Sequence, residues 1–586
     1  MDFRALVALE KLPLICYNQF EFMFGFIRRN AGKIIYLFLL FSIFYSNTFH
    51  EEYPDEYDNI LGGKFIVHGI LPYTGFFSHH GPVGYFLAAI LYLLSGSSFV
   101  KFRIVYSVFL FLYSLGIYKY LKKSVGKIET KFYLFFLLIL GIASTYFWGH
   151  MLIADNLSAY FIVPTLALII LKVVYKKLIT RSDLIFISIL LSLALLSALT
   201  VIYLVAFIYL FCFYFYLKDV GFRIVWKNII YFLLIMIAPY VIFAIYLFIS
   251  GSFPDYIYQS IILNEKYYIY NSPSSPSGMI NPIRYAIVIF HNFYYNFTNL
   301  LFQFKDFNFV FPFNITLAIA DFALIIYLFM RKHYALSILL ILSLVYSNVR
   351  SSPLDSSEKD YQAAVYILIS LFSMCFFLVK ACGDLKSENE YGKKMILSVF
   401  IALVGLYSFF NIIFLFGKFQ EKVYTKYMGT ASLIYDRPDL APIINKILRP
   451  NDYIWIGPLD FKDYLYVNST KLASRYHFLI PAMGRSEKIK AEMISDFVRN
   501  KPKVIFFDQN FSVLGNNPQS YAPFFVFFLK ENYITLYGYK NNKYITTIPV
   551  SNTVDLEAKM YIRKENADEI IAKLLSLGIV KATSKQ

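Results

Sequence analysis

Acidic side chains cluster between positions 51 and 58, where Glu51, Glu52, Asp55, Glu56 and Asp58 follow one another closely. A carboxylate held beside a weakly acidic hydroxyl can accept its proton, which accelerates a reaction of that hydroxyl by roughly 10²–10⁴-fold. We therefore take Asp55 and Glu56 as candidate catalytic residues. The alternative is a solvated acidic loop without a chemical role.

A further candidate is Asp155, a single carboxylate in the apolar stretch FWGHMLIADNLSAYF. Its charge could contact a substrate or, together with Asp55, a divalent cation such as Mg or Mn, although the same chemistry is compatible with no cofactor. The alternative is a helix cap, because an Asp before a helix accepts from free backbone N–H groups. His150 lies in the same stretch and either faces the same cavity or is hydrogen-bonded in the core.

Two histidines and two cations complete the set of candidates. His79 and His80 are adjacent and lack HxH or HxxxH spacing, so we favour a phosphate or sugar contact over a metal site. Arg350, in SNVRSSPLDSSEKDYQ, would offset the charge of a phosphate leaving group through its bidentate fork. For Lys359 in the same segment, ordinary loop charge is the favoured interpretation.

The composition indicates which elements must position these residues. The 586 residues are 58% hydrophobic and 20% aromatic, the mean hydropathy is +0.55, and runs of about 18 or more apolar residues recur. These values predict a polytopic α-helical membrane protein. The net charge of +17 does not indicate nucleic acid, because Lys and Arg gather in short loops between the apolar runs.

The basic loops also predict an orientation, since a cytoplasmic amino terminus places every basic cluster on the cytoplasmic side. We expect a retained first helix, because no small-residue cleavage site follows an apolar core in residues 1–32. The four cysteines show no metal-ligand spacing and imply no disulfide framework. Eleven spans are predicted near 33–49, 102–120, 132–148, 157–172, 183–198, 200–217, 228–250, 309–330, 334–348, 361–380 and 395–418.

Two other apolar segments, 82–98 and 283–303, are expected to lie along the outer membrane surface. Counting either one as a span would move basic loops to the outside, and polar residues interrupt the second, as in an interfacial helix. Asp321 falls in the middle of a predicted helix, where a charge is costly. We expect it to pair with a polar neighbour and give it no chemical role.

The composition changes after Phe419, which divides the chain into a transmembrane domain (1–419) and a soluble extracytoplasmic domain (420–586). Short β-like runs (453–456, 503–507, 533–537, 543–548) alternate there with helical patterns (440–448, 488–498, 567–577). This alternation predicts a small α/β domain. The Ser/Pro tract at 272–278 is expected to be a hinge or lid in an outer loop.

Residues 55–85 and 147–161 resemble the GT-C superfamily of membrane glycosyltransferases, of the protein-mannosyltransferase and lipid A aminoarabinose-transferase type (glycosyltransferase 39-like). Asp55-Glu56 matches that family's acidic pair, and Ala154-Asp155-Asn156 resembles its second acidic motif. The family's usual Lys-Pro-Pro is replaced by His80-Gly81-Pro82, and the unmodified His80 side chain is charged only at mildly acidic pH. Further matches are Tyr57–Gly69, Leu71-Pro72-Tyr73, Phe76–His79 and Arg103.

The resemblance implies a GT-C fold and an inverting glycosyltransferase. The donor would be a sugar on a polyprenyl phosphate, and the acceptor a lipid, glycan or protein outside a bacterial cytoplasmic (inner) membrane. Asp55 would accept the acceptor's proton with Glu56 beside it, Asp155 would orient substrate or a cation, and Arg350 would offset phosphate charge. The alternatives are a lipid-linked glycan ligase or polymerase, a flippase-type transporter and a noncatalytic assembly scaffold.

Overall fold

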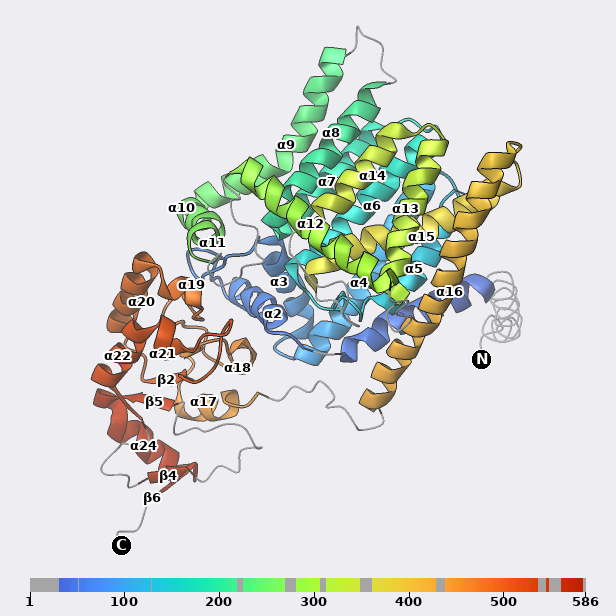
Figure 1. The fold of residues 1–586 in the computed structure, drawn as a ribbon. Helices are drawn as coiled ribbons and strands as arrows, with labels where there is room; N and C mark the ends of the chain where they lie inside the picture. The colour runs from blue at the N-terminus through green and yellow to red at the C-terminus, as the bar shows by residue number, and fades with distance from the viewer. Residues whose placement is uncertain are drawn as a thin grey trace, which may run out of the picture.

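The chain folds into a bundle of apolar helices followed by a small α/β unit (Figure 1). In Figure 1 the α/β unit lies beside one end of the bundle, next to α2 (Pro54–Val67) and α11 (Leu263–Lys266). The computed structural model describes residues 31–50, 52–127, 129–218, 225–268, 281–305, 312–347, 361–427, 438–535, 544–546 and 560–582.

Within the described residues, seven helices are long and apolar enough to cross a membrane. Their outer surfaces carry large exposed apolar side chains, for example Leu234 and Ile242, which a soluble protein of this size would bury. The prediction of a helical protein with membrane-length helices is confirmed. The seven are Ala31–Phe49, Phe99–Ser124, Ala154–Val174, Leu199–Lys218, Trp226–Ile249, Tyr361–Leu385 and Tyr391–Phe410.

The other four predicted spans are also helices: α5 (Lys131–Ala143), α7 (Arg181–Ser197), α13 (Pro312–Met330) and α14 (Tyr334–Tyr346). Helices α5 and α14 have 13 residues each, which is about 20 Å at the α-helical rise and shorter than a hydrocarbon core of about 30 Å. The helix predicted over 132–148 ends at Ala143, and turns follow from Ser144 onward. Eleven spans remain a prediction.

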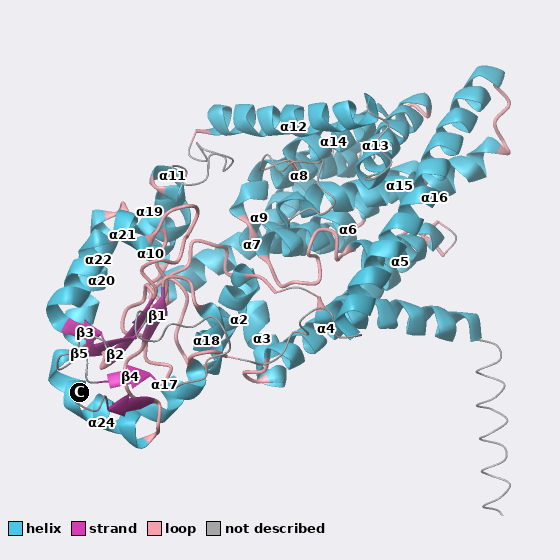
Figure 2. Cartoon of the chain, turned by 60° about the horizontal axis from the view of Figure 1, so that its bottom comes forward, coloured by secondary structure: helices cyan, strands magenta, loops and turns pink. Residues whose placement is uncertain are grey.

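The two segments assigned to the outer surface form α3 (Val83–Ser95) and α12 (Pro282–Lys305), and neither is among the seven. Helix α3 packs closely on α2, since a Cβ on Gly62 would lie 2.1 Å from the Tyr85 ring and only glycine permits that approach. Helix α12 crosses α13 and α14, as Figure 2 shows, and Tyr285 donates to the Thr200 carbonyl at 2.6 Å.

The bundle is completed by α4 (Phe99–Ser124), α6 (Ala154–Val174), α8 (Ile202–Lys218), α9 (Val225–Ile249), α15 (Ala364–Leu385) and α16 (Tyr391–Tyr427). Asp321 on α13 accepts a hydrogen bond from the Ser370 hydroxyl on α15 at 2.5 Å, so it does pair with a polar neighbour. Helix α16 continues to Tyr427, beyond the domain boundary expected at 419.

The α/β unit contains a four-stranded sheet in the order β1-β2-β5-β3, with β1 parallel to β2 and the other pairs antiparallel. Trp455 on β1 packs against Phe497 and Phe525, which anchors α20 and α22 to the sheet. The strands are β1 (Trp455–Gly457), β2 (Val504–Phe507), β3 (Tyr533–Thr535), β5 (Met560–Arg563), and a separate pair, β4 (Tyr544–Thr546) with β6 (Val580–Ala582). The helices are α17 (Ala441–Ile447), α18 (Phe461–Tyr466), α19 (Pro481–Gly484), α20 (Glu487–Asn500), α21 (Pro518–Tyr521), α22 (Pro523–Asn532) and α24 (Ala567–Ser576).

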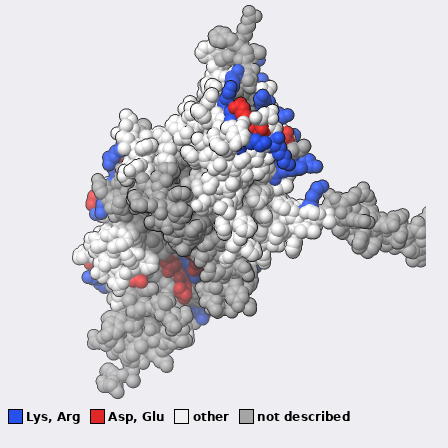
Figure 3. Space-filling model, turned by 45° about the vertical axis from the view of Figure 1, so that its right-hand side comes forward, with Lys and Arg blue, Asp and Glu red and all other residues white. Residues whose placement is uncertain are grey.

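Charge is distributed unevenly along the bundle. Figure 3 shows Lys and Arg gathered at the upper end of the visible face, an uncharged band below them and a group of acidic atoms lower down. Arg331, Lys380 and Lys393 belong to the basic loops expected in the cytoplasm and pair with acidic side chains of those loops. This distribution is typical of a membrane protein with basic residues at its cytoplasmic end.

We expect a Gln519→Cys variant, made with Cys16 and Cys382 replaced by serine, to react with a membrane-impermeant maleimide in intact cells. Gln519 is exposed on the α/β unit, which the basic-loop rule puts outside. The matched control is the exposed native Cys382 with only Cys16 replaced, which should react only after the membrane is opened. Labelling of Gln519→Cys only after lysis would contradict the outward orientation.

Candidate functional site

The acidic cluster lies at the start of α2, where Tyr53 is the N-cap and Pro54 the first helical residue. Proline is suited to this position because its missing N–H would have no helical partner. Asp55 and Glu56 occupy the first turn, where the helix dipole favours negative charge. Asp55 is half-buried, whereas Glu56 and the more distant Asp58 are buried. Glu51 lies outside the described residues.

Glu56 forms a buried ion pair with Arg103 of α4, and both side chains are fully inaccessible to solvent. Arg103 Nε donates to Glu56 Oε1 at 2.8 Å and Nη2 donates to Oε2 at 2.5 Å. Arg103 Nη1 also donates to the backbone carbonyls of Thr48 and His50. Burial raises the pKa of the Glu56 carboxyl, and the Arg103 charge opposes that rise. This geometry gives Glu56 a structural task and favours Asp55 as the base.

Asp58 connects α2 to α3 and to the α/β unit. Its Oδ2 accepts from the Tyr85 hydroxyl at 2.8 Å, and its Oδ1 lies 3.3 Å from His477 Nε2. His477 is itself buried among aromatic rings, including Phe65 and Phe461. Two of the acidic residues, Glu56 and Asp58, therefore hold the loop in place.

Lys64 also connects α2 to the α/β unit. Its buried ammonium donates to the carbonyls of Tyr464, Leu465 and Val467 at 2.9, 3.2 and 2.6 Å, which satisfies carbonyls at the end of α18. Burial lowers the pKa of Lys64 to about 8. Nearby, the Phe77 N–H donates to the Arg475 carbonyl at 2.8 Å.

Asp55 has a different kind of partner. Its Oδ2 accepts from the hydroxyl of Tyr361, which opens the helical segment Tyr361–Leu385, at 2.8 Å. Tyr361 packs in a small cluster with Met151 and Ile153, and the rings of Tyr53 and Trp148 lie against it. The half-buried carboxylate thus borders an aromatic surface built from three distant parts of the chain.

Asp155 follows the 144–153 loop. Met151 and Ile153 of that loop pack against Tyr361, the hydrogen-bond partner of Asp55. Helix α6 begins at Ala154, so Asp155 lies inside its first turn, and Ile153 occupies the N-cap position. Asp155 is therefore not a helix cap, the alternative to a substrate or cation contact. The preceding loop contacts α2, because Asn59 Nδ2 donates to the Leu152 carbonyl at 3.0 Å. The imidazole of His150 is buried, 5.7 Å between ring centroids from His50.

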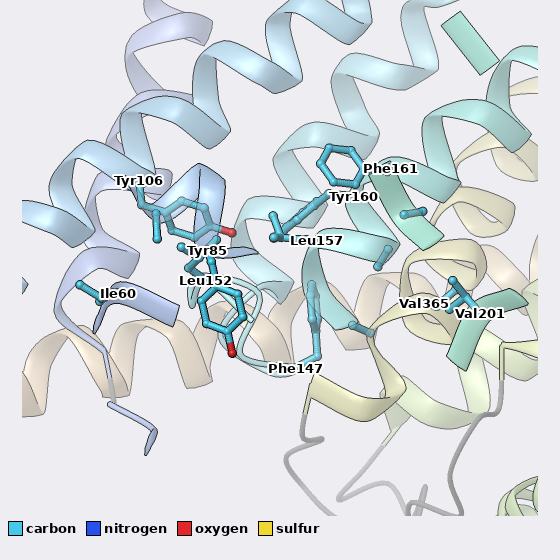
Figure 4. Close-up of a cluster of buried hydrophobic side chains, with 14 of the residues drawn as sticks. Ile60, Tyr85, Tyr106, Phe147, Leu152, Leu157, Tyr160, Phe161, Val201 and Val365 are labelled. Atoms are coloured by element: carbon cyan, nitrogen blue, oxygen red, sulfur yellow. The ribbon is translucent and has the colours of Figure 1, made fainter. Parts of the chain in front are cut away.

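A continuous apolar core supports these segments from behind. Figure 4 shows side chains from α2, α3, α4, the 144–153 loop and α6 converging on one another, with Val201 and Val365 at the far side. Each labelled residue is buried. Their packing holds the start of α2 and the start of α6 in fixed relation. The labelled residues are Ile60, Tyr85, Tyr106, Phe147, Leu152, Leu157, Tyr160, Phe161, Val201 and Val365.

The two histidines lie at the far end of the α2–α3 loop. Their rings are 4.0 Å apart between centroids, and His79 stacks on Tyr268. Asn264 of α11 donates to the His79 carbonyl at 3.2 Å. Their contact with substrate stays a prediction. Arg350 and Lys359 lie outside the described residues, as does the 272–278 tract.

In the described part of the chain, no group of three or more His, Cys, Asp or Glu side chains is placed to hold a metal ion. A cation bound between Asp55 and Asp155 would therefore have to complete its coordination with backbone, water or substrate oxygens. Oxygen ligands of that kind suit Mg and Mn.

Several residues of this site were not singled out from the sequence. Trp148 lies in an aromatic run, Tyr361 follows the polar segment SSPLDSSEKD, and a fifth of the chain is aromatic, so residue type gives no signal. Lys64 has a weak signal, since a single lysine within an apolar, glycine-containing helix must find partners. The resemblance matched Glu56 and Arg103 separately, and it did not predict that the two side chains form an ion pair.

Neither a protein-family model nor a curated protein matches the chain. The fold defines a class, a helical protein with membrane-length apolar helices that carries a small α/β unit after them. The more specific assignment depends on the residues of the site.

We expect Glu56→Gln to destabilise the protein by about 3–5 kcal/mol, because Arg103 would be left buried without its counter-charge. Thermal unfolding of the purified protein in detergent would measure the loss. The matched control is Asp55→Asn, the same chemical change on the preceding, half-buried residue, which should unfold close to wild type. Equal midpoints for the two variants would contradict the structural task of Glu56.

Proposed function

We propose that this protein is an integral-membrane inverting glycosyltransferase that moves a sugar from a polyprenyl-phosphate donor to an acceptor at the outer membrane face. The observation that carries the proposal is Asp55, a half-buried carboxylate at a helix start, oriented by the Tyr361 hydroxyl at 2.8 Å. Its acidic neighbours Glu56 and Asp58 have buried protein partners. The exposed Glu52 pairs with the Tyr57 hydroxyl and with Lys462. Asp55 is thus the best-suited base of the cluster.

The reaction assigns one task to each candidate. Asp55 accepts the proton of an acceptor hydroxyl, and the hydroxyl oxygen attacks the anomeric carbon of the donor. The bond from that carbon to the phosphate oxygen breaks, the polyprenyl phosphate leaves, and the anomeric configuration inverts. Asp155 orients substrate or a divalent cation, His79 and His80 contact the donor headgroup, and Arg350 offsets the phosphate charge.

The proposed arrangement in the membrane has eleven spans, a cytoplasmic amino terminus, and an active site and α/β unit that face outward. Contacts between helix ends support this arrangement. Tyr346, at the end of α14, lies 4.7 Å from Phe207 and 6.2 Å from Tyr203 between ring centroids, and the topology expects all three near the outer face. Helix α12, with exposed Ile283, Ile287 and Phe290, would rest in the interface. The membrane would be a bacterial cytoplasmic membrane.

The GT-C fold belongs to the same proposal. The buried Glu56–Arg103 pair joins two positions that the resemblance matched, and the starts of α2 and α6 meet at Tyr361. Both features are compatible with a site built from two acidic motifs. A ligase or polymerase would transfer a whole lipid-linked glycan, whereas a flippase would move lipid without forming a glycosidic bond. Labelled polyprenyl-phosphate sugar offered to membranes distinguishes bond formation from lipid movement.

Asp55→Asn should lower sugar transfer by about two orders of magnitude or more, because it keeps the shape of the side chain and removes the base. The measurement is transfer of radiolabelled sugar from the polyprenyl phosphate to endogenous acceptors in membranes. Yield and thermal midpoint should stay near wild type. Transfer at a near-normal rate would assign the base to another group.

Asp155→Asn should also cripple transfer while the protein stays folded, since the charge of Asp155 orients substrate or a cation. Asp155 lies in the first turn of α6, where replacing the carboxylate by an amide loses only a helix-dipole interaction of about 0.3–1 kcal/mol, so a residue with only a structural task would tolerate the change. The same transfer assay measures the effect, with added Mg or Mn as a second condition. A fully active variant would remove Asp155 from the site.

A further inference from the structure

Three aromatic rings form a continuous surface beside Asp55, and we call Tyr53, Trp148 and Tyr361 the aromatic platform. The ring centroids of Tyr53 and Trp148 are 5.0 Å apart, those of Tyr53 and Tyr361 5.6 Å, and those of Trp148 and Tyr361 6.1 Å. Tyr53 and Trp148 are half-buried, whereas Tyr361 is buried. The platform is joined to Asp55 through the Tyr361 hydroxyl, which donates to Asp55 Oδ2 at 2.8 Å.

Trp148 shows two features that packing alone does not require. Its backbone has φ +56°, a left-handed conformation that is strained for a large side chain by roughly 1–3 kcal/mol. Its indole Nε1–H is buried, and no acceptor for it exists among the described residues. A buried donor without a partner is destabilising by roughly 1–3 kcal/mol. Strain and an unused donor at one residue are typical of a ligand site.

The surrounding loop holds Trp148 in this conformation. The Asn156 side chain donates to the Trp148 carbonyl at 2.7 Å, and the Met151 N–H donates to the same oxygen at 3.0 Å. The Gly149 N–H donates to the Ser144 carbonyl at 2.6 Å. The backbone of Trp148 is thus fixed before any ligand arrives, which lowers the entropy lost on binding.

The chemistry of the platform matches a pyranose ring. Such a ring has an apolar face of C–H groups and an edge of hydroxyls, so it needs a flat apolar surface together with a few placed polar groups. The aromatic platform supplies the surface and Trp148 Nε1–H supplies a donor for a ring hydroxyl, which leaves Asp55 to the hydroxyl of the acceptor. A lipid tail or an inorganic phosphate would not use this combination.

We propose that the aromatic platform binds the pyranose ring of the lipid-linked donor, with Trp148 Nε1–H donating to a ring hydroxyl. The proposal rests on the proposed glycosyltransferase function and deepens it, because it assigns the sugar-binding residues and makes the donor sugar a pyranose. Binding there gives Trp148 Nε1–H a hydrogen-bond acceptor. It also brings the anomeric carbon close to Asp55, which takes the proton of the acceptor hydroxyl.

The test measures affinity rather than turnover. Polyprenyl phosphates carrying mannose, glucose or galactose, and the bare polyprenyl phosphate, are titrated against the full-length Asp55→Asn protein in nanodiscs, so that no transfer occurs. We expect at least one of the three sugars to bind about tenfold more tightly than the bare lipid. The Trp148→Phe substitution keeps an aromatic ring and removes the N–H donor. When it is combined with Asp55→Asn, most of this sugar-dependent gain in affinity should be lost.

Two controls keep the result interpretable. Affinity for the bare lipid should be unchanged in Trp148→Phe, which reports an intact fold. Trp226→Phe removes a tryptophan that is exposed on the bundle surface, and it should leave every affinity unchanged. A sugar-dependent gain that survives Trp148→Phe, or three sugars that bind no better than the bare lipid, would overturn the platform.

The outcomes also separate this inference from the proposed function. Trp148-dependent sugar binding without sugar transfer by the wild-type protein would support the platform and refute the transferase. Transfer by the wild-type protein, together with sugar binding that is unchanged by Trp148→Phe, would support the transferase and refute the platform.

Discussion

The buried ion pair between Glu56 and Arg103 is the constraint on which the candidate site depends. It joins α2 to α4, and through the Thr48 and His50 carbonyls it also fixes the end of the first helix. Two opposite charges removed from water are tolerated only when their geometry is good and their remaining donors are used. Here several donors of Arg103 have acceptors, so the start of α2 has a defined position relative to the bundle.

The Glu56–Arg103 ion pair also determines where Asp55 lies. The pair fixes one side chain of the first turn of α2, and the adjacent residue then projects toward Tyr361 and the 144–153 loop. The α/β unit completes the arrangement from the other side, since Lys64 and Asp58 engage it directly. The loop between the first helix and α3 is therefore held from within the bundle and from outside it. A site that needs accurate placement of a carboxylate benefits from that double support.

Much of the fold could be predicted from hydrophobic periodicity, and the reasons for the failures are physical. Strands β1 to β4 and helices α17, α20 and α24 coincide with predicted runs, because short β-branched and aromatic segments between turns are a direct signal. Strand β5 was missed, since its residues, Met560–Arg563, carry a charge and alternate weakly, yet they lie between β2 and β3. The site was predictable only in part. Residue type pointed to Asp55 and Asp155, but partners separated by hundreds of positions, such as Tyr361, cannot be inferred from one sequence.

That separation has a consequence for how the protein is made. Tyr361 follows Asp55 by 306 positions, and the carbonyls that receive Lys64 follow it by 400 and more. Chains emerge from the ribosome from the amino terminus onward at about 5–20 residues per second, so helix α2 is exposed for tens of seconds before these partners exist. During that interval the ammonium of Lys64 remains hydrated and the aromatic platform is incomplete. The site is thus complete only when the α/β unit contacts a helix that was synthesised 400 residues before its partner carbonyl on Tyr464.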